Sequence, residues 1–367
     1  MAWWRSGYAA DCKSVHPSSI LGQASKSHLK SGVGGQSSLL DSGPETEPRI
    51  AVVVVNWNGW RNTLACLDAL RGTQGAAWRL IIIDNASTDE SIARLSNLGE
   101  DVVLIPAGRN GGWTGGNNLG VRYALRSGFD YVMLLNNDAF VETDTLARLL
   151  AAAQAETPAR QIFGAQMLTP QGEPVEYAAA DIDPQSGMPR WAPLSELGPV
   201  IDGLAPVATV HGGAMFARRE VFETVGAFDD AFFLYLDESD WCRRATGMGY
   251  GFAIVEQAHV RHIEAASTGG RESPLYRYFM LRNTLLFARR HLTRAQRRRV
   301  LREIYWDLRD ATRRVDARPW PWAFLTSAHP SLRARRRAML DYLTGRLGDC
   351  PPIIRDLTRQ WREGGAP

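Results

Sequence analysis

Acidic side chains stand at the ends of two apolar runs of the chain. The run Leu80–Ile83 is followed by Asp84, and the run Tyr131–Leu135 is followed by residues 136–138, Asn-Asn-Asp. Both runs are typical of strands buried on two faces, and in an open parallel sheet ligands bind beyond the carboxyl ends of the strands. Because a buried carboxylate needs a partner, we expect a metal ion or a sugar hydroxyl at this edge.

The triplet Asn136-Asn137-Asp138 is an N-x-D version of the D-x-D pattern. Mg²⁺ and Mn²⁺ bind one or two protein carboxylates together with substrate phosphates, which makes Asp138 a candidate metal ligand. Asn136 carries no charge and suits a ribose hydroxyl better, although a polar turn after a strand is the alternative. Asp84 can accept the imide N–H of a uracil or thymine, or can form an Asx turn before the next helix.

Three acids in four residues follow the apolar segment Phe232–Leu236, namely Asp237, Glu238 and Asp240. Like charges placed close together among apolar neighbours raise the pKa of at least one of them, which suits a general base that takes a proton from a hydroxyl. The alternative is the acidic N-terminus of a helix over residues 240–245, where the helix dipole favours acids. One acid is enough for that second role.

Two further segments carry candidate ligand-binding groups. His259 and His262 follow the predicted strand 251–255, and strand alternation places them on different sides, so at most one completes the metal shell begun by Asp138. The Gly-rich segment 110–118 precedes a helix, and its backbone N–H groups can approach an anion closely. It matches neither the dinucleotide-binding nor the Walker A pattern, and an ordinary turn is the alternative.

Strands and helices alternate with short links in the first half of the chain. This predicts a doubly wound α/β fold with a mostly parallel sheet, followed by a mixed half and by helices. The proline-containing stretch 170–206 is interpreted as a surface excursion. The expected strands are 50–55, 80–83, 102–105, 131–135, 162–167, 207–210, 214–217 and 251–255, and the expected helices are 62–70, one ending at 98, one from the end of the Gly-rich segment to 126, 142–155, 276–290 and 297–314.

The composition is that of a globular chain with an uneven charge. The 367 residues are 45% apolar with a net charge of +3, but residues 291–367 hold 17 arginines, no lysine and 8 acids, a net charge of +9. No apolar run approaches the ~18 residues that a membrane span needs. The four cysteines form no CxxC pair, which favours a reducing compartment over a disulfide framework or a zinc site.

Residues 1–48 differ from the rest of the chain. They are rich in Ser and Gly and have neither apolar periodicity nor the h-region of a signal peptide, so we expect a disordered leader. Residues 8–17 resemble the conceptual translation of a tRNA gene, and a second hypothesis places the natural start downstream, at a non-Met codon such as that of Val33. N-terminal sequencing tests this hypothesis, and recovery of Ala2 or Trp3 would contradict it.

The Arg-rich segment 291–367 interleaves arginines with apolar residues such as Leu301, Tyr305, Trp322 and Leu343. A basic amphipathic surface that contains tryptophan can lie on anionic lipid. Helices that pack on the rest of the chain and expose their arginines to solvent are the alternative. We expect no nucleic-acid partner, since no nucleic-acid-binding module is present and the rest of the chain is acidic.

Six short segments form an ordered set: Val53–Gly59, Asp84–Asp89, Asn110–Asn118, Leu135–Asp138, Arg219–Phe222 with Gly226–Asp229, and Tyr235–Cys242. Their order resembles that of family 2 glycosyltransferases, and the overall pattern most resembles the rhamnosyltransferase-like branch. The resemblance covers residues 49–292 and leaves 291–367 as a helical extension. It implies a GT-A fold, a nucleotide-diphosphate sugar donor, Mg²⁺ or Mn²⁺, and inversion at the anomeric carbon.

The resemblance also implies roles for individual residues. Asp138 and His262 would hold the metal, and Glu238 takes the position of the catalytic base. Asp237 remains an alternative base, because the usual Glu-Asp pair appears here as Asp-Glu. The residues implied at the nucleotide sugar are Asn56, Asp84 at the base, Asn110, Gly116, Asn117, Asn136 at the ribose, and Asn137.

The implied function is metal-dependent, inverting transfer of L-rhamnose from a dTDP- or UDP-sugar to a hydroxyl of a glycan or polyprenyl-linked acceptor in bacterial surface polysaccharide synthesis. The implied location is the cytoplasm, at the inner face of the plasma membrane. Two other classes compete. A non-catalytic nucleotide-sugar-binding relative does not need the Asp237–Glu238 pair, and a nucleotidyltransferase normally has a Gly-rich signature with a basic residue where this chain has Asn56-Trp57-Asn58.

Overall fold

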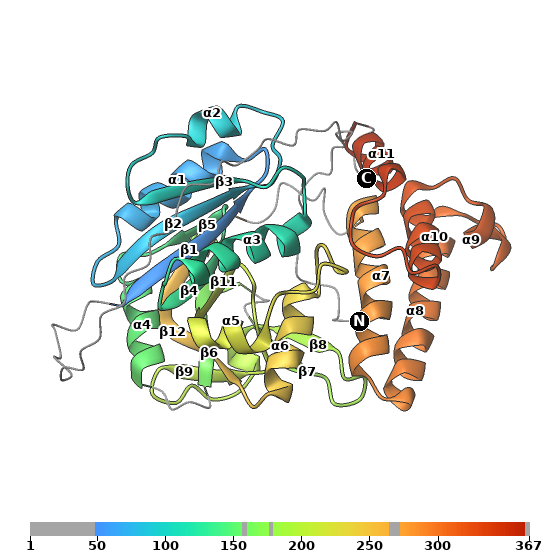
Figure 1. Ribbon diagram of the computed structural model, residues 1–367. Coiled ribbons are helices and arrows are strands. Elements are labelled where there is room, and N and C mark those ends of the chain that lie inside the picture. Colours follow the sequence, from blue (N-terminus) through green and yellow to red (C-terminus); the bar gives the residue numbers. More distant parts are fainter. Residues whose placement is uncertain (1–47, 156–159, 176–178, 264–271, 364–367) are drawn as a thin grey trace, which may run out of the picture.

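A computed structural model describes residues 48–155, 160–175, 179–263 and 272–363. Figure 1 shows a sheet with helices on both faces and, beside it, a stack of helices from the C-terminal part of the chain. The predicted disordered leader and the tRNA-like segment lie outside the described residues. Among the described helices, none combines the length and the apolar character needed to cross a bilayer.

The main sheet contains β1 (Arg49–Asn56), β2 (Ala77–Asp84), β3 (Val102–Pro106), β4 (Tyr131–Asn136), β5 (Ala139–Val141), β6 (Arg160–Leu168), β9 (Leu204–Val207), β11 (Ala214–Arg218) and β12 (Gly251–His262). Its order is β3-β2-β1-β4-β11-β6-β12-β5, with β9 on β12. The pairs from β3 to β4 are parallel, and β11 runs antiparallel to both β4 and β6. The doubly wound fold with a mixed second half is thereby confirmed.

Helices bury both faces of the parallel half. Val52 and Val54 of β1 face one layer of helices and Val53 faces the other, and all three are 0% exposed. A strand covered on both faces is apolar at consecutive positions, which is why these runs could be recognised in the sequence. The first layer contains α1 (Trp60–Arg71) and α4 (Thr145–Ala155), and the second contains α3 (Gly112–Arg126), α5 (Arg219–Val225) and α6 (Asp237–Gly247).

Two predicted helix boundaries are wrong. The short helix α2 (Ser91–Leu95) ends before residue 98. The segment 110–118 is mostly helical, because α3 begins at Gly112. An added Cβ at Gly116 would lie 2.7 Å from Val55, so the glycines of this segment allow α3 to pack closely on β1. This tertiary contact compensates for the low helix propensity of glycine.

The stretch 170–206 is not a mere surface excursion. It supplies β7 (Ala179–Ile182) and β8 (Pro189–Ala192), which form a second sheet with β10 (Thr209–Val210) in the order β10-β7-β8. Trp191 is 6% exposed and Ala180 is fully buried. The prolines obscured these strands in the sequence, but Pro189 begins a strand and Pro206 lies in a strand at the sheet margin, positions that tolerate proline.

The C-terminal helices form a layer of their own beside the sheet (Figure 1). Helix α7 (Pro274–His291) is buried along most of its length and packs against the others, which confirms the two long predicted helices. Thr293 begins α8 with a capping box, a strong local start signal. The remaining helices are α8 (Arg294–Val315), α9 (Trp322–Thr326), α10 (Pro330–Leu343) and α11 (Pro352–Glu363).

Candidate active site

Amide and carboxylate side chains line the carboxyl edge of the parallel strands. The register aligns Asn56 with Asp84 and Val55 with Asn136. Asn56 Nδ2 donates to Asp84 Oδ1 over 2.9 Å, and the backbone N–H of Ser87 donates to Asp84 Oδ2 over 3.0 Å. The Asp84 side chain therefore accepts from the backbone three residues on, whereas the Asx turn considered from the sequence would span two residues. Each carboxylate oxygen retains a second lone pair that can accept a ligand N–H.

Asp138 and His262 lie side by side at the same edge. The pairing of β5 with β12 aligns His262 with Ala139, and the N–H of Ile263 donates to the carbonyl oxygen of Asp138. His262 Nε2 is 3.2 Å from Asp138 Oδ1, with the two side chains 2% and 17% exposed. His259 lies apart from this pair, with Nδ1 3.2 Å from Glu142 Oε2. The structure thus brings one of the two histidines to Asp138, as the alternation predicted.

A carboxylate and an imidazole at this spacing fit a hard divalent cation. Two neighbouring ligands of an octahedral ion with bonds of ~2.1 Å lie about 3 Å apart, close to the Asp138–His262 distance. Among the described residues no group of three or more His, Cys, Asp and Glu side chains is placed to hold a metal. A cation at this pair would therefore complete its shell with oxygens of the substrate or of water.

The acid pair begins helix α6. Asp237 and Glu238 are 2% and 5% exposed, and Thr114 Oγ1 donates to Asp237 Oδ2 over 2.7 Å. Burial raises the pKa of Glu238, and the neighbouring charge of Asp237 raises it further. Burial also raises the pKa of Asp237. A carboxylate whose pKa is raised is a stronger base, which suits a general base that takes a proton from a hydroxyl.

Trp113 and Gly212 connect the acid pair to the strand edge. An added Cβ at Gly212 would lie 2.6 Å from the Trp113 ring and 3.5 Å from Glu238 Cβ. Trp113 Nε1 donates to Asn136 Oδ1 over 3.4 Å, and Asn136 Nδ2 lies 3.4 Å from His262 Nε2. A continuous series of contacts therefore runs from Glu238 to the Asp138–His262 pair, and the two candidate reactive centres belong to one site.

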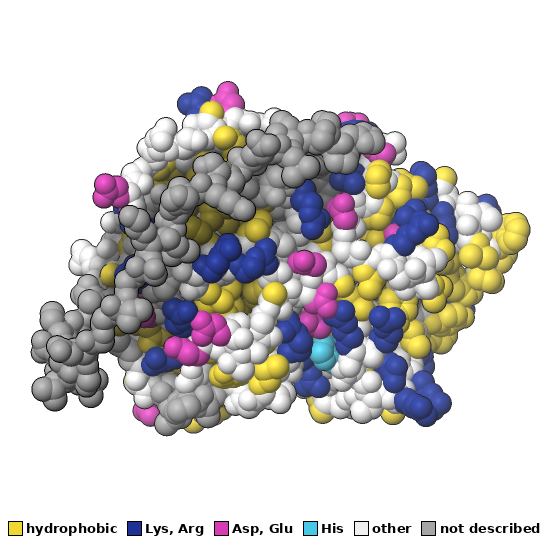
Figure 2. Space-filling view, in the orientation of Figure 1, with side chains coloured by type: hydrophobic (Ala, Val, Ile, Leu, Met, Phe, Trp, Pro, Cys, Tyr) yellow, Lys and Arg dark blue, Asp and Glu magenta, His cyan; other side chains and the backbone are white. Residues whose placement is uncertain are grey.

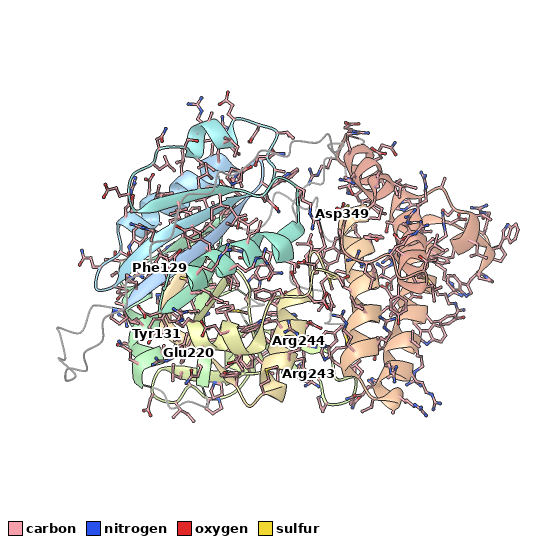
Figure 3. The ribbon with its side chains drawn as sticks, in the orientation of Figure 1. Phe129, Tyr131, Glu220, Arg243, Arg244 and Asp349 are labelled. Atoms are coloured by element: carbon pink, nitrogen blue, oxygen red, sulfur yellow. The ribbon has the colours of Figure 1, made fainter. Side chains whose placement is uncertain are left out.

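Asp240 has a different environment from the other two acids. Its carboxylate binds Arg244 of the next turn (Figure 3), Arg290 and His291. Burial alone would raise the pKa of Asp240, but His291 and Arg244 together hold it below its usual value. This residue is an ion-pair anchor between α6 and α7. The far end of β4, which Phe129 and Tyr131 mark in Figure 3, carries none of the predicted site residues.

The structure places the remaining predicted donor contacts in two groups. Asn110 and Asn137 are near the edge: Asn110 Oδ1 accepts from the N–H of Gly112, and Asn137 Nδ2 lies 3.4 Å from Thr63 Oγ1. Gly116 instead packs on β1, and Asn117 Nδ2 donates within α3 to the carbonyl oxygen of Trp113. A direct role for the second group at the donor stays a prediction.

Three site residues were missed in the sequence. Trp113 and Thr114 were treated only as members of the Gly-rich segment, although both contact the acid pair or the edge. His211 lies with its ring centroid 6.2 Å from that of His262, and burial lowers its pKa well below the usual value, so it is neutral. The signal in the sequence that could have identified His211 is its place in the tripeptide His-Gly-Gly directly before strand β11.

Comparisons with known proteins place the chain among glycosyltransferases. Residues 51–226 match the family model Glycosyl transferase family 2. The low-salt glycan biosynthesis hexosyltransferase Agl10 of Haloferax volcanii is 25% identical over 244 residues, which cover 65% of this chain and 74% of that protein. The dTDP-rhamnosyl transferase RfbF of Shigella flexneri is 25% identical over 224 residues, or 58% of this chain and 71% of that protein.

Among solved structures, residues 1–349 of S. aureus TarS in complex with UDP-GlcNAc give a TM-score of 0.51 at 13% identity, covering 86% of this chain and 92% of that one. At this identity the likeness concerns the fold. The family model and the fold together indicate a GT-A glycosyltransferase. Residues 51–226 form a glycosyltransferase family 2 domain, and the chain is similar to named rhamnosyltransferases, which confirms the resemblance found in the motifs.

Proposed function

We propose that this enzyme transfers L-rhamnose, with inversion, from dTDP-rhamnose to a hydroxyl of a lipid-linked glycan that serves surface polysaccharide synthesis. The observation that carries the proposal is the single site that joins the Asp138–His262 pair to the buried Asp237–Glu238 pair. The similarity to a dTDP-rhamnosyl transferase supports the choice of sugar. The family assignment and the acid pair speak against a nucleotidyltransferase and against a non-catalytic relative.

In the proposed mechanism Glu238 takes the proton of the acceptor hydroxyl. The acceptor oxygen attacks the anomeric carbon in line, and the bond to the diphosphate breaks with its electron pair on the leaving oxygen. Asp237 is oriented by Thr114, and its charge strengthens the affinity of Glu238 for the proton that Glu238 takes. One base is sufficient for inversion. Asp138 and His262 would hold Mg²⁺ or Mn²⁺, which when bound offsets charge on the diphosphate.

The donor base lies, in this proposal, beside Asp84. The Asp84 carboxylate is 1% exposed and is oriented by Asn56 and Ser87, so it presents its free lone pairs in a fixed direction. An imide N–H of thymine or uracil matches such an acceptor, whereas cytosine presents no N–H at that ring position. The ribose then lies toward Asn136 on β4, two strands across the sheet from Asp84, with β1 between them.

A mostly apolar pocket lies beside the turn that leads into the acid pair. Tyr235 and Leu236 of this turn line it together with Trp191, Met280 and Ile304. An apolar wall beside this turn suits the lipid-proximal part of an acceptor more than a wholly polar glycan. We assign this pocket to the acceptor.

The helical extension supports a location at an anionic membrane. Figure 2 shows arginine and hydrophobic side chains next to one another over this region. Leu301, Trp322 and Leu343 are 52%, 63% and 76% exposed, and Arg309 lies over the ring of Trp306. The extension also packs its inner face on α7, so the membrane proposal concerns only its outer face. Arginine beside exposed tryptophan is a combination that binds anionic lipid headgroups.

Binding and hydrolysis of a panel of nucleotide sugars, with and without Mn²⁺, tests the proposed function. We expect one dTDP-sugar to bind in the presence of Mn²⁺ and to lose that binding in Asp138→Ala. Asp144→Ala is the matched control, because Asp144 is a surface acid paired with Arg148 away from the edge. If the folded protein binds no donor, the proposed function is wrong; if it binds only another sugar nucleotide, the choice of rhamnose is wrong.

A further inference from the structure

The turn that delivers the acid pair has a strained backbone. Phe233, Tyr235 and Leu236 have φ values of 64°, 68° and 61°, in the left-handed region that residues with a Cβ rarely adopt. Leu236 directly precedes Asp237 and occupies the N-cap position of α6 without a capping side chain. Strain of this kind persists only where neighbouring groups hold it, and it is concentrated at functional sites.

Two consecutive side chains of α7 hold this turn. The amide nitrogen of Asn283 lies 3.0, 2.7 and 2.9 Å from the carbonyl oxygens of Phe232, Leu234 and Tyr235. Arg282 donates through Nη2 to the carbonyl oxygens of Ala231 and Phe232. Both side chains are 0% exposed, and within the protein they supply hydrogen-bond donors to the carbonyl oxygens of Ala231, Phe232, Leu234 and Tyr235. The carbonyl oxygen of Phe233 accepts instead from the N–H of Thr114.

The two residues also fix each other. Arg282 Nε donates to Asn283 Oδ1 over 2.9 Å, which directs the NH₂ group of Asn283 toward the turn. Arg282 Nη1 donates in addition to the carbonyl oxygen of Gly348, and the N–H of Gly348 donates to the carbonyl oxygen of Ala231. The α10–α11 loop, which Asp349 marks in Figure 3, therefore closes the turn from a second direction.

We propose that Arg282 and Asn283 are positioning residues for transfer: from α7 they hold the strained turn 231–236 and thereby fix the direction in which Glu238 faces the acceptor hydroxyl. This inference rests on the proposed function. Both side chains are fully buried, so the proposed role acts through the turn and not through contact with substrate. Their hydrogen bonds go beyond what helix packing requires, because the side-chain amide nitrogen of Asn283 alone contacts three carbonyl oxygens of the turn.

The test compares Asn283→Ala with Ser331→Ala. Ser331 lies on α10, is 3% exposed and accepts a hydrogen bond from Arg335, so Ser331→Ala removes a buried hydrogen bond without touching the turn, Arg282 or Asn283. Because a displacement of about 1 Å costs about 100-fold in rate, we expect kcat of Asn283→Ala to fall by about that factor. The Kd of the donor stays within about twofold, since the strand edge is unchanged. Ser331→Ala keeps kcat near that of the wild type.

A second measurement does not depend on activity. Hydrogen exchange of the backbone amides 232–240 should become faster in Asn283→Ala and stay unchanged in Ser331→Ala. If Asn283→Ala does not fold, Arg282→Lys replaces it, with Arg335→Lys as control. Arg335 is 3% exposed and binds Ser331 and Asp307, away from the turn.

The outcomes separate the two proposals. Unchanged exchange at 232–240 in the α7 variants, or a kcat no lower than that of the controls, overturns the positioning role. A wild-type protein that binds and hydrolyses no donor overturns the proposed function instead, and in that case the exchange rates still decide whether Arg282 and Asn283 hold the turn.

Discussion

Replacing Gly112 by alanine perturbs the contact between the start of α3 and the turn before the acid pair. Gly112 has a φ of +72°, and an added Cβ would lie 2.2 Å from the carbonyl oxygen of Phe233 and 2.7 Å from Cγ of its ring. Non-bonded carbon contacts have their optimum at about 3.5–4.0 Å, so one of the two backbones must move by about 1 Å or more. Phe233 is part of the turn that leads into Asp237, and the acid pair moves with it.

Gly108 offers a matched control for this substitution. Its φ is also +72°, and no atom lies within 4 Å of an added Cβ. Both variants carry the cost of alanine in the left-handed region, about 1–2 kcal/mol. Only Gly112→Ala adds an overpacking cost of about 1–3 kcal/mol. The difference between the two variants therefore isolates the contact with Phe233.

Urea unfolding and the kcat of transfer measure the two consequences. We expect Gly112→Ala to lose about 1–3 kcal/mol more unfolding free energy than Gly108→Ala. We also expect its kcat to fall about 100-fold, because the acid pair is displaced, while Gly108→Ala retains kcat. Equal losses of unfolding free energy and of kcat in the two variants would refute the argument that Gly112 is needed for close approach to the turn.

Three further predictions concern the acids of the site. Glu238→Gln lowers kcat by about 10²–10⁴-fold with donor binding intact, and a smaller loss than that of Asp237→Asn would assign the base to Asp237. Burial and Asp237 raise the pKa of Glu238, so the folded state keeps a proton that the unfolded chain has lost, and stability falls as the pH rises through that window. Glu238→Gln should remove this fall, which urea unfolding at several pH values measures; an unchanged pH dependence would contradict the raised pKa. Asp240→Asn breaks the buried ion pairs with Arg290 and His291 and should cost about 3 kcal/mol of unfolding free energy, measured by urea unfolding. A loss under about 1 kcal/mol would show that these pairs are energetically neutral.

The sequence by itself determined the elements and the edge on which the site is built. The apolar runs that became β1, β2 and β4 are buried on both faces, so their composition is visible without knowledge of their neighbours. Asp84 and Asn136 were recognised because they follow such runs directly, and the parallel register then brings both beside β1. The order of six motifs was sufficient to indicate the family.

Only the tertiary structure decided which side chains meet. His262 reaches Asp138 because β12 pairs with the three-residue strand β5, which is too short to have a periodic signal. Glu238 reaches the same edge through Trp113 and Gly212, and the strained turn before it depends on Asn283 of α7. These contacts join residues that are far apart in the chain. They depend on strand register and helix packing, which local propensity and hydrophobic periodicity do not specify.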